Sequence, residues 1–151
     1  MSDSNEHLLY LCGGEIDEGE FYVSIWSESL NPATLTELLG VQPTESYRRG
    51  EFSKNGKIQY KHGSWMYSTG RRSFRQGKSC EESFDDFMRN FPGDAEVWSQ
   101  ILAEYDAKVS IVLWMKTWNR EFDLSAFALN ELGRRNLSVH IDTYLDSEEE
   151  T

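Results

Sequence analysis

Apolar side chains recur at alternate positions in three segments of the chain, and this pattern predicts three strands. Residues 21–26 (FYVSIW) are apolar or aromatic on both faces, as expected of a strand inside a sheet. Residues 109–118 (VSIVLWMKTW) have the strongest strand pattern, and residues 138–145 (SVHIDTYL) give the last strand. Two further extended segments are expected at residues 44–52 and 65–68, joined through a turn at the Asn55-Gly56 pair.

Helical signals separate these strands. A short helix is expected at residues 32–39, because Asn31 suits the N-cap position and Gly40 suits the left-handed stop. Ser79 opens a Ser-x-x-Glu capping box, which predicts the start of a second helix. Further helices are expected near residues 97–105 and at residues 124–132, the last closed by Gly133. The apolar positions of the two central helices are Phe84, Phe87, Met88, Phe91, Val97, Trp98, Ile101, Leu102 and Tyr105.

The order strand–helix–strand occurs twice, at residues 21–51 and at residues 109–145. Because such a unit makes a right-handed crossover onto one sheet, the chain is predicted to be α+β. We expect a ferredoxin-like or related sandwich, in which one mainly antiparallel sheet has helices packed on one face. On its other face, Trp26, Trp114 and Tyr144 are candidates for contact with a partner. The predicted core includes Leu38, Trp65, Phe87, Ile111, Leu113 and Ile141.

The length of 151 residues suits one compact domain. We expect a flexible acidic arm at residues 1–19, a single α+β domain at residues 20–146 and an acidic tail at residues 147–151. The chain has no apolar run of about 18–20 residues that could span a bilayer, and its N-terminus lacks the pattern of a secretory signal. Its two cysteines suggest no disulfide framework, so a cytoplasmic location is expected.

Charge is distributed unevenly along the chain, whose net charge is −11. Residues 41–78 contain nine Lys or Arg and two acids, whereas the remainder is strongly acidic. The basic side chains are expected to face acids of the following helix, or alternatively to form an anion site. The acids are Glu81, Glu82, Asp85 and Asp86, and the candidate anion-binding residues are Arg48, Arg49, Arg71, Arg72 and Arg75.

Catalytic and metal-binding motifs are lacking in the sequence. The nucleophile-elbow, zinc-protease, dinucleotide and phosphate-loop patterns do not occur, and the histidines at positions 7, 62 and 140 are scattered. We therefore expect no metal, no cofactor and no enzymatic activity. The alternation of His140 and Asp142 could provide a base and its orienting group, but a structural role is the preferred interpretation. Cys80, at the predicted helix start beside Lys78, is a weaker candidate for a reactive thiol.

A series of short motifs runs through the chain: LLG at 38–40, VQPT at 41–44, RG at 49–50, GSW at 63–65, LG at 132–133 and IDTY at 141–144. Over roughly residues 20–146, their order resembles a bacterial family described as domain of unknown function 4279. The resemblance implies no established activity and no catalytic residues. It implies that the chain is similar to immunity proteins, which neutralise secreted bacterial toxins.

Three functions are compared on this basis. An immunity protein would bind a basic protein partner, such as a nuclease-type toxin, through an acidic surface with an exposed aromatic anchor. The candidate contacts are Glu96, Glu104, Asp106 and Trp118. A small-ligand or anion-sensing module using the five arginines is the alternative, and an enzyme using His140 and Asp142 is ranked last. The net negative charge argues against nucleic acid as the partner, and no membrane association is expected.

Overall fold

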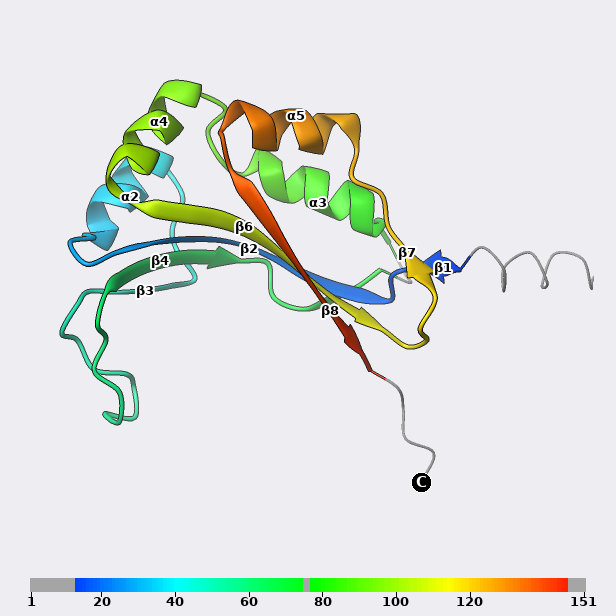
Figure 1. Cartoon of the computed structure of the whole chain (residues 1–151), viewed down its shortest axis with the longest axis horizontal. Coiled ribbons are helices and arrows are strands. Elements are labelled where there is room, and N and C mark those ends of the chain that lie inside the picture. The colour runs from blue at the N-terminus through cyan, green and yellow to red at the C-terminus, as the bar shows by residue number, and fades with distance from the viewer. Residues whose placement is uncertain (1–12, 75–76, 147–151) are drawn as a thin grey trace, which may run out of the picture.

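The computed structural model describes residues 13–74 and 77–146 of the chain. Five strands follow one another across the main sheet in the order β3-β4-β2-β6-β8 (Figure 1). They are β3 (Glu45–Tyr47), β4 (Gly63–Ser68), β2 (Glu18–Ser27), β6 (Asp106–Met115) and β8 (Ser138–Leu145). All neighbours are antiparallel except β6 and β8, which are parallel. The three principal predicted strands therefore share one mainly antiparallel sheet, as expected.

The strands from β2 to β6 have ferredoxin-like topology. A helix joins β2 to β3, and β4 then inserts between these two parallel strands, so that the first strand–helix–strand unit is split. The second predicted unit, from β6 to β8, places its two strands side by side and adds a fifth strand to the sheet. Three further short strands are present among the described residues. β5 (Arg72–Ser73) pairs with the start of β2, and β1 (Gly14–Glu15) pairs with β7 (Arg120–Glu121).

Four helices cover one face of the sheet and leave the opposite face open among the described residues (Figure 1). They are α2 (Pro32–Leu39), α3 (Cys80–Arg89), α4 (Ala95–Glu104) and α5 (Ala126–Arg134). The predicted start signals are confirmed: Asn31 caps α2, and Ser79 with Glu82 forms both bonds of the capping box of α3, each 3.1 Å long.

The last helix differs from its predicted bounds. It begins two residues later than expected because Ser125, whose hydroxyl accepts from the amide of Ala128, is its N-cap. Gly133 does not end the helix but lies within it. The chain turns instead at Asn136, which has a φ of 54°. Asparagine tolerates this left-handed conformation, so the prediction that Gly133 ends the helix is wrong.

The core lies between the helices and the covered face of the sheet. Phe21, Val23 and Ile25 of β2 point into it, and the predicted core residues Trp65, Phe87, Ile111 and Leu113 are buried there. Two predicted core residues are not buried: Leu38 is 37% exposed and Ile141 is 44% exposed. In α2 the buried positions are Leu35 and Leu39. Ile141 lies on the edge strand β8, where the described residues provide a neighbouring strand on one side only.

Ordered structure begins before residue 20, where we placed the start of the domain. Ile16 and Asp17 are buried, and β2 begins at Glu18. The Asp17 carboxylate accepts hydrogen bonds from the Lys116 amide at 2.8 Å and from Arg120 Nε at 3.0 Å. This segment is thereby attached to the far end of β6. The rest of the expected arm, residues 1–12, and the expected tail, residues 147–151, lie outside the described residues.

Candidate functional site

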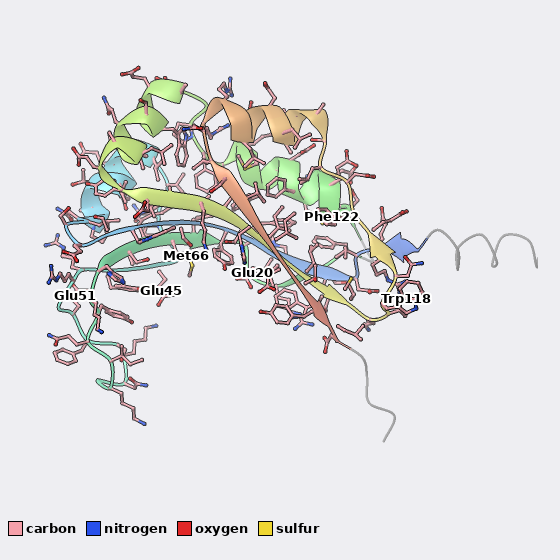
Figure 2. The ribbon with its side chains drawn as sticks, viewed as in Figure 1. Glu20, Glu45, Glu51, Met66, Trp118 and Phe122 are labelled. Carbon is pink, nitrogen blue, oxygen red and sulfur yellow. The ribbon has the colours of Figure 1, made fainter. Side chains whose placement is uncertain are left out.

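The open face of the sheet, defined by the side chains that point away from the helices, is the candidate functional site. Alternation along the strands brings residues distant in sequence into rows across this face. In one row Ser68, Tyr22, Ser110 and His140 are neighbours, and in another Glu45, Met66, Ser24 and Lys108 are neighbours. Figure 2 shows Glu20, Glu45 and Met66 on this side of the sheet.

Aromatic side chains stand at both ends of the open face. At one end the rings of Trp114 and Tyr144 stack at 6.1 Å, and the Arg71 guanidinium lies 4.2 Å from the centre of the Trp114 ring. At the other end the Lys108 ammonium lies 5.8 Å from the centre of the Trp26 ring. The three predicted aromatic candidates, Trp26, Trp114 and Tyr144, thus all lie on the uncovered face.

Two carboxylates hold the Arg71 side chain at one end of the open face. It pairs with Glu18 and donates to Asp146 at 2.6 Å, so it joins β2 to the end of β8. The hydrogen bond to Glu18, then that to Asp146, raises the pKa of Arg71 above its ordinary value. Because both carboxylates already neutralise this guanidinium, the cluster fixes the edge of the face and offers little attraction to an anion.

Acids outnumber bases on the remainder of the open face. Glu20, Glu45, Asp106 and Asp142 point to this side, while Lys108 is their basic neighbour. Glu20 accepts a hydrogen bond of 2.5 Å from the Ser68 hydroxyl. Asp142 accepts one of 2.7 Å from the Tyr144 hydroxyl, and this bond raises the pKa of Tyr144. The face therefore combines large aromatic surfaces with negative charge.

A buried hydroxyl lies beneath the centre of the face. Ser110 is fully buried, and its Oγ has no hydrogen-bond partner among the described residues. His140 is its neighbour across the pair of β6 and β8. His140 and Asp142 share the face as predicted, but the hydrogen bond found at Asp142 comes from Tyr144. The geometry of the described residues thus shows no base–orienter contact between the two.

The loop between β3 and β4, residues 48–62, projects from one end of the sheet (Figure 1). Tyr47 and Tyr60 stack at its base with ring centres 3.5 Å apart, and the predicted turn forms at Gly56, where φ is 68°. Phe52 and Ile58 near its tip are 62% and 60% exposed. A groove of about 670 Å³ lies between this loop and β3, lined by residues that include Glu45, Glu51, Phe52, Lys54 and Tyr60.

The predicted anion-binding arginines do not converge. Arg48 donates to Asn31 at 2.9 Å and Arg49 pairs with Glu28 at 3.1 Å, both at the base of the projecting loop. Arg71 belongs to the cluster at the opposite end of the face, and Arg72 donates to the carbonyl oxygen of Thr69. Arg75 lies outside the described residues.

The basic segment contacts one of the four acids expected on the following helix, and its arginines pair with acids elsewhere. Among the described residues of this segment, Lys78 is the one that pairs with α3, through Asp86. Asp85 instead accepts from the Ser125 hydroxyl at 2.6 Å, and Glu82 belongs to the capping box. The acids that neutralise the arginines come from β2, from the turn after it and from the end of β8.

The predicted partner contacts fall in two places. Glu104 and Asp106 flank the junction of α4 and β6, and Glu96 lies about 12 Å from Glu104 along α4. Of these three exposed acids, Asp106 points to the open face, opposite Trp26 in register. Trp118 is 76% exposed, as expected, but it lies beyond the far end of β6 (Figure 2).

The structure also bears on the candidate thiol of Cys80 and on metal binding. Burial, then the charge of Glu15, raises the pKa of the Cys80 thiol to about 12, which opposes the thiolate that the helix start would favour. Residues 13–74 and 77–146 contain no group of three His, Cys, Asp or Glu arranged to hold a metal ion. No helix within these ranges is long and apolar enough to cross a membrane.

The aromatic residues of the face and two of its acids, Asp106 and Asp142, were predicted from the sequence, whereas Glu20, Glu45 and Ser110 were not. The alternation that predicted the strands also assigns Glu20 and Ser110 to the outer side, so the signal was present for these two. The Arg71 cluster had no local signal, because its partners lie 53 and 75 positions away in the chain.

Comparison with protein families gives a match to the model described as Domain of unknown function (DUF4279), over residues 17–146. Comparisons with curated proteins and with solved structures gave no match. The matched range contains every strand of the main sheet, all four described helices and thus the whole open face. The chain therefore belongs to the family of domain of unknown function 4279.

Proposed function

We propose that this protein is a non-catalytic binding protein that holds a basic protein partner against the open face of its sheet. It acts in the cytoplasm as an immunity protein and neutralises a bacterial toxin of the nuclease type. The observation that carries the proposal is the composition of the face, where Trp26, Trp114 and Tyr144 stand among Glu20, Glu45, Asp106 and Asp142.

The chemistry of a nuclease explains why such a face would suit it. An enzyme that cuts nucleic acid must attract phosphates, so the surface around its active site is basic. An acidic protein competes for that surface, and its charges accelerate association. Large aromatic side chains contribute most when they are buried in the centre of an interface, where they slow dissociation.

The face also provides rigidity. Its aromatic side chains stand on β2, β6 and β8, which pair over most of their length, and the stack of Trp114 on Tyr144 lies beneath the Arg71 cluster. A partner that binds there meets side chains already held in place, which reduces the entropy lost on association. The groove beside β3 extends the surface toward the projecting loop, where Glu45 and Glu51 continue the negative charge.

A co-expression experiment tests this function. The toxin would be the protein encoded next to this chain in its genome, produced in a host whose growth it stops. We expect the unmodified chain to restore growth and to co-purify with that protein. Replacing two acids beside the face, Glu45→Lys and Asp106→Lys, should abolish protection. The matched control, Glu121→Lys with Asp123→Lys at the β7 end, carries the same charge change and should protect fully.

Two results would overturn the proposal. One is full protection by the chain with Glu45→Lys and Asp106→Lys, which would place the interface elsewhere. The other is turnover of a substrate by the purified chain alone that His140→Ala removes, which would make the protein an enzyme.

A further inference from the structure

The outer edge of β8 is long, and none of the described strands pairs with it. All eight of its residues pair with β6 without interruption, and no described strand lies on its other side. Its sequence, SVHIDTYL, contains no lysine, arginine or proline, the residues that usually prevent edge-to-edge pairing. Ile141, Tyr144 and Leu145 are 44%, 49% and 59% exposed. The opposite edge, β3, has only three residues and lies next to the projecting loop.

The direction of the backbone groups follows from one hydrogen bond. The amide of Asp146 donates to the carbonyl oxygen of Met115, toward β6. Because the backbone groups of successive residues in a strand point to alternate sides, Val139, Ile141 and Thr143 direct their N–H and C=O groups outward. These groups form a row of donors and acceptors along the free edge.

We propose that β8 pairs with β8 of a second copy of this chain, antiparallel and around a two-fold axis at Ile141, so that one sheet continues through a dimer. Val139, Ile141 and Thr143 of each copy then exchange backbone hydrogen bonds, about six in total. Ile141 meets Ile141 of the second copy on the helix-facing side. The Ile141 side chain, which is partly exposed in the single chain, is thereby covered.

Side-chain charge selects this register. Only two antiparallel registers keep seven residues of β8 overlapped with their side chains on matching faces, and their axes lie at Ile141 and at Asp142. An axis at Asp142 puts two carboxylates directly opposite each other, which is unfavourable. An axis at Ile141 instead places His140 opposite Asp142 of the second copy, twice by symmetry. This is the closer type of cross-strand pair, with Cα atoms about 4.5 Å apart.

The atoms needed for that contact are available. Asp142 uses Oδ2 to accept from the Tyr144 hydroxyl, and Oδ1 can accept a second bond from an imidazole N–H. The open faces of the two copies become continuous across the axis. This inference does not rest on the proposed function, because it concerns the isolated chain.

Sedimentation equilibrium of the purified chain over a range of concentrations tests the dimer. We expect a reversible monomer–dimer equilibrium. Ile141→Lys brings two ammonium groups together at the axis and should leave a monomer. Thr143→Pro removes an outward amide without affecting the ladder to β6, and should do the same. Leu129→Lys, at a residue of α5 that is 56% exposed, is the matched control and should leave the equilibrium unchanged.

A charge exchange tests the register. His140→Asp places carboxylates opposite each other in both symmetric pairs and should raise the dimer dissociation constant about tenfold. The double variant with His140→Asp and Asp142→His restores opposite partners and should recover most of the affinity. Circular dichroism checks that each variant is folded. If the Thr143→Pro variant is unfolded, the Ile141→Lys variant alone tests whether β8 forms the dimer interface.

Four results would overturn the inference. The first is a chain that remains monomeric up to about 1 mM. The second is a dimer that survives Ile141→Lys. The third is a double variant that fails to recover the affinity lost in His140→Asp. A dimer that is instead disrupted by Phe52→Ser in the projecting loop would also contradict pairing through β8.

Discussion

The guanidinium of Arg135 lies inside the molecule, and only 2% of the surface of this residue is exposed. It pairs with Glu131 one turn earlier in α5 and donates to the carbonyl oxygens of Phe91 and Pro92, each at 3.1 Å. The Trp98 indole donates to the same Pro92 oxygen at 2.9 Å. Arg135 thus fastens α5 to the connection between α3 and α4. Nothing in the local pattern distinguishes it from its half-exposed neighbour Arg134, so its burial could not be predicted from sequence.

The pair of Glu131 and Arg135 makes the stability depend on pH. Hydrogen bonds from Arg135, and then from Arg134, hold the pKa of Glu131 below its ordinary value of 4.5. Its carboxyl therefore binds protons less readily when folded, so it contributes stability above about pH 4.5, and this contribution is lost as the pH falls through the lowered pKa. Replacing Glu131 by Gln should lower the free energy of unfolding at neutral pH and flatten its decline in acid.

Urea unfolding at a series of pH values measures this effect. Glu37→Gln, at an exposed position of α2, removes the same charge and should leave the acid dependence close to that of the unmodified chain. An equally steep decline in acid for the Glu131→Gln variant would show that this carboxyl does not contribute to it.

At the scale of elements, local chemistry determined what could be predicted. The starts of α2 and α3 follow from Asn31 and Ser79, because an N-cap acts on amides two or three residues away. The main strands follow from alternation. The error at the end of α5 is local, because Asn136 and not Gly133 takes the left-handed conformation. The errors at Leu38 and Ile141 have another cause, since which side of an element is covered depends on segments far away in sequence. The same limit applies to the open face, whose aromatic residues were predicted but whose Arg71 cluster was not.

The capping box of α3 offers a prediction about this element. Ser79→Ala removes the acceptor for the Glu82 amide and should lower the free energy of unfolding by about 0.5–2 kcal/mol. Ser99→Ala, at an exposed position within α4, should change it by less than about 0.5 kcal/mol. Chemical denaturation of both variants makes the comparison. Equal effects at the two positions would mean that the cap contributes nothing specific.

At the scale of the whole molecule, charge is arranged in space differently from its arrangement along the chain. Arg48 and Arg49 are held by groups at the base of the projecting loop, and Arg71 is held between two carboxylates. The basic segment is therefore partly neutralised where it meets the domain. Acids of β2, β3, β6 and β8 meanwhile gather on one face with the aromatic residues. A basic partner would meet this face, and the sequence alone could not show that its acids come together.

The kinetics of association with the protein encoded beside this chain test the central claim most directly. The association rate should fall as salt is raised, because the Debye length shrinks from about 10 Å at 0.1 M to about 3 Å at 1 M. Reversing Glu45 and Asp106 to Lys should slow association and weaken its salt dependence, whereas reversing Arg48 and Arg49 to Glu should not slow it. If the arginine reversal abolishes binding and the acidic reversal has no effect, the partner binds the basic segment and the account is contradicted.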